Sequence, residues 1–303
     1  MRQIRTDLAM EQTGARDLPG VTISSWEAGD IVITEVRIDT GEGAKLLNKA
    51  PGVYVTLECA PLRKQGPELR IAMASLLGEE LLRLMPPEDD RPVLVIGLGN
   101  RSVTPDSLGP KTVERTLVTR HIFRELPDSV DDRMSPVCAV APGVLGVTGI
   151  ETLEVAHGIV REVNPRVVIV IDALTARASS RVGSTVQLTD TGIQPGSGVG
   201  NHRSALTDET LGVKVLALGV PTVIYAATIA RDALSMLSED DGTREEELDH
   251  LCEKLFEGAL GEMIVTPREI DDLVGDVAQI LASGINQALH PGLSEKEILT
   301  MMS

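Results

Sequence analysis

The chain has few aromatic residues and too little positive charge for several classes of partner. Its 303 residues include two Phe, two Tyr and one Trp, which are too scattered to form the stacking surface used to bind single-stranded nucleic acid. Lys and Arg number 28 against 45 Asp and Glu, so the net charge is −17. Because bulk negative charge repels phosphate, we expect no direct nucleic-acid partner and no binding to anionic membranes.

Cysteines and long apolar runs are also scarce. Cys59, Cys138 and Cys252 are odd in number, far apart and without a CxxC pair, which excludes a disulfide framework or a zinc site of the usual spacing. No apolar stretch approaches the ~20 residues of a membrane span, and the first 20 residues contain no apolar run of signal-peptide length. These absences predict a reduced, cytoplasmic protein that is neither exported nor inserted into a membrane.

The order of apolar segments predicts an α/β fold with a mainly parallel sheet. Continuous apolar runs at 92–97 and 166–171 are typical of strands that are covered on both faces, and helix-like segments near 112–122 and 150–163 lie between them. This order predicts a twisted parallel sheet with helices on both faces. Further strands are expected at 184–188, 213–218 and 263–265.

Both ends of the chain are expected to add to this sheet. Residues 1 to about 20 show no sustained periodicity, which predicts a mobile tail. The β-branched runs 30–38 and 52–57 predict an N-terminal antiparallel addition, and 68–85 has the spacing of a helix. The part after Tyr225 is expected to be mainly helical, apart from an acidic turn at 238–242. Capping-box residues predict two helix starts there, one from Thr266 to Glu269 and one from Ser294 to Glu297.

The two glycines in Gly97-Leu98-Gly99-Asn100 follow a buried strand, as in a dinucleotide-binding loop. Position 102 is Ser, so the third glycine of that pattern is missing, and a tight exit from the strand explains the first two. A nucleotide- or peptide-binding module that uses this loop remains one alternative. No GxSxG or HExxH motif occurs, and among the five histidines only His202 lies in a Gly-rich loop.

Two acids are each expected just beyond the carboxyl end of a buried strand. Asp106 follows the strand at 92–97, and Asp172 follows six apolar residues. In an open parallel sheet, ligands collect outside the carboxyl ends of the strands, where two such loops can meet. Two carboxyl groups that share a proton there could activate water. The competing interpretation is that Asp106 caps a helix and Asp172 holds a turn.

At these residues the sequence resembles the germination proteases of spore-forming bacteria, which degrade small acid-soluble spore proteins. The resemblance rests on the segments 5–11, 97–100, 103–110, 141–144, 170–174, 195–201, 219–222 and 263–267, so it covers nearly the whole chain. It implies a cofactor-independent endopeptidase of the spore interior, assembled as a homotetramer, with a fold like that of hydrogenase-maturation proteases. It also implies that Asp106 and Asp172 are catalytic.

The resemblance further implies a zymogen that processes itself between Asp7 and Leu8. Residues 1–7 would then be a propeptide, and 8–303 a single peptidase domain. If the tail imitates the substrate, its acids Asp7 and Glu11 need positive partners. Arg101 and Arg177 are the expected substrate-binding residues, because each lies close in sequence to a proposed catalytic acid.

A second enzymatic hypothesis makes the same two acids metal ligands. In this metal-dependent peptidase, His202 would be the third ligand beside Asp106 and Asp172.

Overall fold

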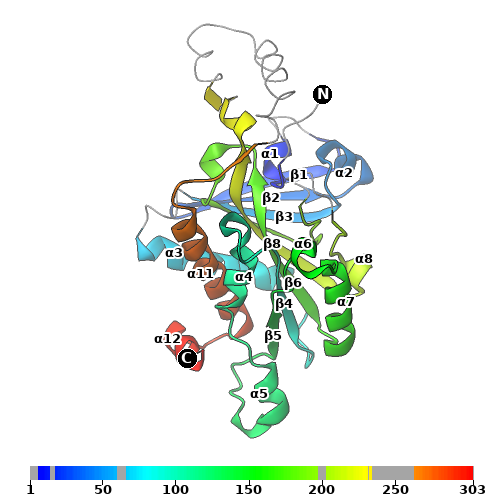
Figure 1. Ribbon diagram of the computed structural model, residues 1–303, viewed down its shortest axis with the longest axis vertical. Coiled ribbons are helices and arrows are strands. Elements are labelled where there is room, and N and C mark those ends of the chain that lie inside the picture. Colours follow the sequence, from blue (N-terminus) through cyan, green and yellow to red (C-terminus); the bar gives the residue numbers. More distant parts are fainter. Residues whose placement is uncertain are drawn as a thin grey trace.

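The computed structural model describes residues 6–13, 18–59, 66–196, 203–230, 232–233 and 263–302. Within these ranges one mixed sheet runs through the molecule in the order β1-β2-β3-β7-β8-β6-β4-β5, with β9 paired to β8 (Figure 1). The strands are β1 Val21–Ala28, β2 Ile31–Ile38, β3 Gly52–Glu58, β4 Val93–Gly97, β5 Val137–Val140, β6 Val167–Ala176, β7 Thr185–Thr189, β8 Lys214–Tyr225 and β9 Ile264–Val265.

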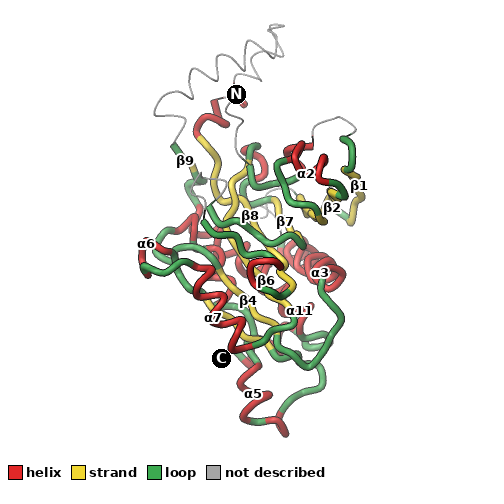
Figure 2. Tube along the Cα trace, turned by 90° about the vertical axis from the view of Figure 1, so that its right-hand side faces the viewer, coloured by secondary structure: helices red, strands yellow, loops and turns green. Residues whose placement is uncertain are grey.

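The parallel core of the sheet consists of β8, β6, β4 and β5. Its strands are buried on both faces, which explains why β4 and β6 are continuous apolar runs. In Figure 2 these strands lie between α7 on one side and α3 and α11 on the other. The longer helices are α3 Pro67–Leu84, α7 Thr152–Val163 and α11 Ile270–Leu289, and the shorter ones include α2 Gly41–Leu47, α4 Leu108–Val113, α5 Arg120–Glu125, α6 Leu145–Thr148, α8 Asp208–Leu211 and α12 Glu295–Met301. The expected parallel sheet with helices on both faces is confirmed.

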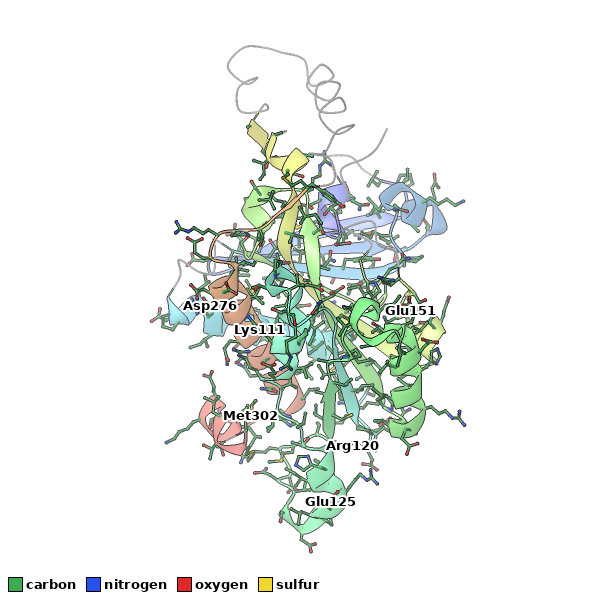
Figure 3. The ribbon with its side chains drawn as sticks, in the orientation of Figure 1. Lys111, Arg120, Glu125, Glu151, Asp276 and Met302 are labelled. Carbon is green, nitrogen blue, oxygen red and sulfur yellow. The ribbon has the colours of Figure 1, made fainter. Side chains whose placement is uncertain are left out.

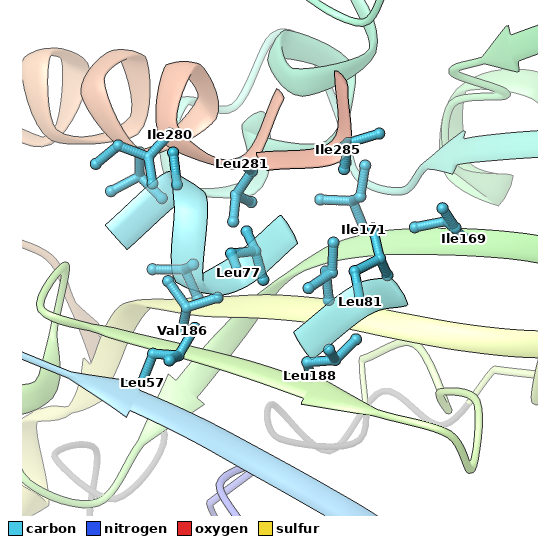
Figure 4. Packing of buried hydrophobic residues seen from close by; sticks show 14 of the residues in the cluster. Leu57, Leu77, Leu81, Ile169, Ile171, Val186, Leu188, Ile280, Leu281 and Ile285 are labelled. Carbon is cyan, nitrogen blue, oxygen red and sulfur yellow. The ribbon is translucent and has the colours of Figure 1, made fainter. Parts of the chain in front are cut away.

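The main core lies between the sheet and the pair α3 and α11. Figure 4 shows side chains of α3 and α11 packed over β6 and over the antiparallel strands β3 and β7. They are Leu77 and Leu81 of α3, Leu281 and Ile285 of α11, Ile169 and Ile171 of β6, Leu57 of β3, and Val186 and Leu188 of β7. All of these side chains are buried. The opposite face of the parallel strands packs on α7 and α8. One core therefore joins the N-terminal strands to the parallel part.

An ion pair at the edge of this packing joins the two long helices. Arg70 of α3 donates two hydrogen bonds to Asp276 of α11, at 2.7 and 2.8 Å, and Figure 3 labels Asp276.

None of the described helices is both long and apolar enough to cross a lipid bilayer.

The antiparallel part is larger than expected. The strands β7, β3, β2 and β1 extend the sheet by antiparallel pairing beyond β8. The expected strands at 30–38 and 52–57 are confirmed as β2 and β3. β1 was missed because six of its eight residues are exposed, so it carries no half-buried alternation.

The expectation of a mobile tail up to residue 20 is wrong for residues 6–13. Leu8 and Ala9 are fully buried, and the short helix α1, Met10–Thr13, follows them. This segment is too short for periodicity to reveal it, since its burial comes from contacts with distant strands rather than from a repeating pattern. It lies beside α2 near the N-terminus in Figure 1.

Three local expectations need correction or confirmation. The segment 112–122 is not one helix, since it contains only the end of α4 and the start of α5. Thr266 does not cap α11, because its hydroxyl donates to the carbonyl oxygen of Thr222 at 2.9 Å, and α11 begins only at Ile270. The capping box of Ser294 with Glu297 at α12 is confirmed. The expected acidic turn at 238–242 lies outside the described residues.

Candidate active site

Two chain segments cross in direct backbone contact and place Asp106. An added Cβ on Gly97 would lie 2.3 Å from the carbonyl oxygen of Gly109, and one on Gly99 would lie 1.9 Å from that of Asp106. Gly99 also has φ +109°, which side chains strongly disfavour. The glycines therefore allow the exit of β4 to press against the start of α4. This agrees with the expected tight strand exit and explains both glycines without a nucleotide.

Asp106 ends the short 3-10 helix Thr104–Asp106 after β4. Its Oδ2 atom accepts a hydrogen bond from the backbone N–H of Asn100 at 2.7 Å. Burial raises the pKa of Asp106, and this hydrogen bond partly opposes the shift. Asp106 does not cap α4, whose N-cap residue is Ser107 and which receives no side-chain cap.

Asp172 lies inside β6 rather than beyond its end, since β6 continues to Ala176. The neighbouring strand β4 ends opposite Ile171, so Asp172 lies just beyond the carboxyl end of β4. The residue is 6% exposed. Burial, together with the charges of Asp106 and Asp7, raises its pKa well above the usual value.

The structure thus brings together the two acids predicted from the sequence. Their charges interact, and the more deeply buried Asp172 is the one that keeps its proton more readily. Two carboxyl groups that share one proton can act as a base and an acid toward the same substrate. This arrangement is suited to hydrolysis by an activated water.

A glycine of the central strand β8 lies between Asp172 and a buried glutamine. Asp172 of β6 pairs with Gly219 of β8, and Gly219 pairs with Gln187 of β7. Residues in register across adjacent strands point to the same face, so both side chains lie on the face opposite α3 and α11. Gly219 contributes no side chain between them, and the side chain of Leu174 covers it, since an added Cβ would lie 2.5 Å from Leu174 Cδ1.

The N-terminal segment contacts β6 beside this part of the sheet. The backbone N–H of Asp7 donates to the carbonyl oxygen of Thr175 at 3.0 Å, and the Asp7 carboxylate accepts from the N–H of Thr175 at 2.9 Å. Leu8 then packs in an apolar cluster with Leu174, Ala176 and Ile224. The Asp7–Leu8 bond, which the resemblance marks as the cleavage site, is therefore held three residues along β6 from Asp172.

Glu11 occupies a polar pocket at the far end of the docked segment. Its side chain is 2% exposed and accepts from the backbone N–H groups of Arg177 and Ala178, at 2.7 and 2.9 Å. The guanidinium of Arg181 donates to it at 2.9 Å, and the hydroxyl of Thr6 donates to it as well. These contacts form a site for a carboxylate.

Arg181 supplies a guanidinium to Glu11, and sequence reasoning missed it. Arg177 contributes a backbone N–H group to the pocket. Arg101 is two-thirds exposed and pairs with Glu114 at 2.7 Å. Proximity in sequence to Asp172 led to Arg177, but the chain turns after β6 and brings Arg181, four residues later, to the pocket.

The metal-ligand hypothesis finds no support in the residues that the structure describes. They contain no group of three or more His, Cys, Asp or Glu side chains arranged to hold a metal ion. His202, the expected third ligand, lies outside the described residues.

Comparisons with known proteins identify the family of the chain. A sequence profile described as Germination protease matches residues 2–260 and 242–301. The germination protease of Clostridium tetani is 37% identical over 316 residues, with 97% of this chain and 98% of the relative covered. That of Clostridium perfringens strain ATCC 13124 is 41% identical over 320 residues and covers 98% of both chains.

Solved structures give a weaker match. A NiFe hydrogenase maturation protease from Thermococcus kodakarensis aligns with a TM-score of 0.34 and 16% identity, over 68% of this chain and 98% of that one. The sequence matches extend along nearly the full length of both partners. The chain is therefore an endopeptidase of the germination protease family.

Proposed function

We propose that this endopeptidase is made as a zymogen that cuts its own chain between Asp7 and Leu8. The observation that carries the proposal is the docking of Asp7 on Thr175 of β6, three residues along the strand from Asp172, whose pKa the charge of Asp7 helps to raise. Residues 1–7 would be the propeptide, and 8–303 the peptidase domain. The substrates would be small acid-soluble spore proteins, degraded in the spore interior during germination.

Asp106 and Asp172 would divide the proton transfers between them. Asp106, in its ionised form, takes a proton from water, whose oxygen adds to the carbonyl carbon of Asp7. Asp172, in its protonated form, gives its proton to the leaving nitrogen of Leu8. The deeper burial of Asp172 supports its role as the acid.

The direct test is to incubate the purified full-length chain and follow its mass. We expect one product that begins at Leu8, together with cleavage of an added small acid-soluble spore protein after the conversion. EDTA treatment with metal analysis distinguishes the metal-dependent alternative, because activity that survives complete removal of metal excludes it. A stable full-length chain that never converts would refute self-processing.

Replacing Arg181 is expected to weaken recognition of an acid four residues after the cleaved bond. A charge-assisted hydrogen bond contributes about 1.5 to 3 kcal/mol, so Arg181→Ala should lower kcat/KM by roughly 10- to 150-fold. The measurement uses the processed enzyme and a peptide that has the sequence of residues 5–12. A second peptide with Gln at the Glu11 position should lose much less.

Three further variants make this test specific. Arg101→Ala and Arg177→Ala compare the two residues that the sequence suggested. We expect smaller losses, because Arg101 pairs with Glu114 and because alanine at position 177 keeps the backbone N–H that binds Glu11. Arg91→Ala is the matched control, since Arg91 is exposed and pairs with Asp89. If Arg181→Ala lowered kcat/KM equally for both peptides, Arg181 would not recognise the acid at the Glu11 position.

The charge of Asp7 is expected to shift the pH dependence of cleavage. A neighbouring negative charge raises the pKa of an acid, and Asp7 acts in this way on Asp172. A peptide with Asn in place of Asp7 removes this charge, so the pKa of Asp172 falls. Since only protonated Asp172 can act as the acid, the alkaline limb of kcat should move to lower pH. The profiles of kcat against pH for the two peptides check this, and coincident alkaline limbs would contradict it.

A homotetramer is proposed for the assembled enzyme. The strand β1 lies at the end of the sheet order and exposes Ile23 and Trp26, and a sheet edge with exposed apolar residues is suited to pairing between subunits. Analytical ultracentrifugation of the full-length chain tests the assembly, with a monomer as the contrary result.

A further inference from the structure

The carbonyl oxygen of Asp7 accepts hydrogen bonds from two side chains. Lys49 Nζ donates at 2.8 Å and Gln187 Nε2 at 3.1 Å. This carbonyl belongs to the peptide bond that we propose is cleaved. Two donors aimed at one carbonyl oxygen, one of them a cation, form the kind of arrangement that stabilises negative charge on that oxygen during peptide hydrolysis.

The amide of Gln187 is held in one orientation. Its Oε1 atom accepts from the backbone N–H of Ala9 at 2.8 Å. Because an N–H group can only donate, the oxygen must face Ala9 and the NH2 group must face Asp7. Gln187 is 6% exposed. Its side chain thus spans Leu8, because it donates to the carbonyl oxygen of Asp7 and accepts from the backbone N–H of Ala9.

Lys49 is positioned by the end of a short helix. Asn48 adopts a left-handed conformation, with φ 46° and ψ 43°, directly after α2. The N–H of Asn48 donates to the carbonyl oxygen of Lys45 and that of Lys49 to the carbonyl oxygen of Ala44, which together make a Schellman motif. This motif turns the chain so that Lys49 reaches the docked segment.

The donor Gln187 and the acid Asp172 lie on different strands. Gln187 on β7 and Asp172 on β6 are separated by Gly219 on β8 and lie on the same face of the sheet, where Gln187 binds the docked segment. Burial lowers the pKa of Lys49, and the charges of Asp7 and Glu11 oppose this shift. The acids of the docked segment therefore favour the charged form of Lys49 while the segment is in place.

We propose that Lys49 and Gln187 form the oxyanion hole of this protease, an assignment that rests on the proposed cleavage at Asp7–Leu8. As water adds to the carbonyl carbon of Asp7 and gives a proton to Asp106, the electron pair of the C=O bond moves onto the oxygen. Lys49 and Gln187 stabilise the charge that develops there. The pair then returns, the C–N bond breaks, and the nitrogen of Leu8 takes the proton of Asp172. One water is consumed, and a carboxyl group and an amine are formed.

The test is the first-order rate of self-processing of the full-length chain, followed by mass spectrometry. Lys49→Met keeps the length of the side chain and removes its charge, and Gln187→Glu keeps the acceptor for Ala9 but replaces the donor. Loss of one oxyanion donor costs roughly 100- to 1,000-fold in rate, and we expect losses of this size for each variant. Lys49→Arg should recover part of the rate. Lys45→Met, on the exposed side of the same helix, should process like the wild type.

A second measurement separates stabilisation of the oxyanion from simple docking of the tail. In a chain that also carries Asp172→Asn, and so stays intact, hydrogen exchange of residues 6–13 reports how firmly the segment is held. We expect Lys49→Met and Gln187→Glu to leave this protection largely unchanged while their rates fall. If protection fell in proportion to the rate, both residues would only position the tail, and the proposal would be wrong. Variants that process at the wild-type rate would also refute it.

The mass of the product distinguishes failure of the proposed oxyanion hole from failure of the proposed cleavage site. A product that begins at a residue other than Leu8 would refute the proposed cleavage site and the oxyanion hole with it. A product that begins at Leu8, formed at full speed by both variants, would refute only the oxyanion hole.

Discussion

Asp172→Asn should slow self-processing and peptide cleavage by roughly 100- to 10,000-fold, the range of general acid catalysis. Asparagine keeps the shape of the side chain but has no proton to give to the leaving nitrogen. The full-length variant should remain uncut while the wild type converts to the product that begins at Leu8. Time courses of both reactions, followed by mass spectrometry, measure the loss.

The same variant should fold at least as well as the wild type at neutral pH. The pKa of Asp172 is raised in the folded protein, so the wild type loses stability as the pH rises from the unfolded-state value, about 3.9, toward the folded-state value. Asparagine removes this loss because it does not ionise. The Tm of the variant should therefore equal or exceed that of the wild type at pH 7, and the difference should shrink in acid.

A matched control and a contrary outcome complete this test. Asp128→Asn changes an exposed acid of the short 3-10 helix Pro127–Ser129 and should leave both reactions unchanged. If Asp172→Asn processed within a few-fold of the wild type, Asp172 would have no part in the chemistry. Asp106→Asn, by the same reasoning, should lose activity because asparagine cannot accept the proton of water.

The parallel core, and Asp172 within it, could be recognised in the sequence for one physical reason. Strands such as β4 and β6 are buried on both faces, so their apolar runs are long enough to recognise, and a carboxylate at the end of such a run is conspicuous. Asp172 follows an apolar run as expected, but the expectation that it lies beyond the end of the strand was wrong, because β6 extends four residues further. Gly97 and Gly99 were correctly interpreted as a tight strand exit.

The partners of the docked segment could not be predicted in this way. Lys49, Arg181 and Gln187 belong to no motif, and each reaches the segment through tertiary packing from a different part of the chain. The burial of Leu8 depends on Leu174 and Ile224, which are more than 160 residues away in sequence. The resemblance to a known family suggested the cleavage site, but it did not show that this segment is packed against the sheet.

Gly99→Ala is expected to disable the enzyme although it replaces neither acid. An alanine at φ +109° is strained, and its Cβ would lie 1.9 Å from the carbonyl oxygen of Asp106. Backbone strain of this kind costs about 1 to 3 kcal/mol, and the overlap with backbone atoms forces the start of α4 to move. A displacement of about 1 Å at a catalytic group can cost ~100-fold in rate, so we expect at least that loss in self-processing, together with a lower Tm.

The control for this variant is Gly275→Ala in α11. An added Cβ there meets no atom within 4 Å, and alanine is favoured over glycine in a helix by about 1 kcal/mol. This change should therefore raise the Tm slightly and leave processing unchanged. If Gly99→Ala also processed normally, the contact between Gly99 and Asp106 would not be what places the catalytic acid.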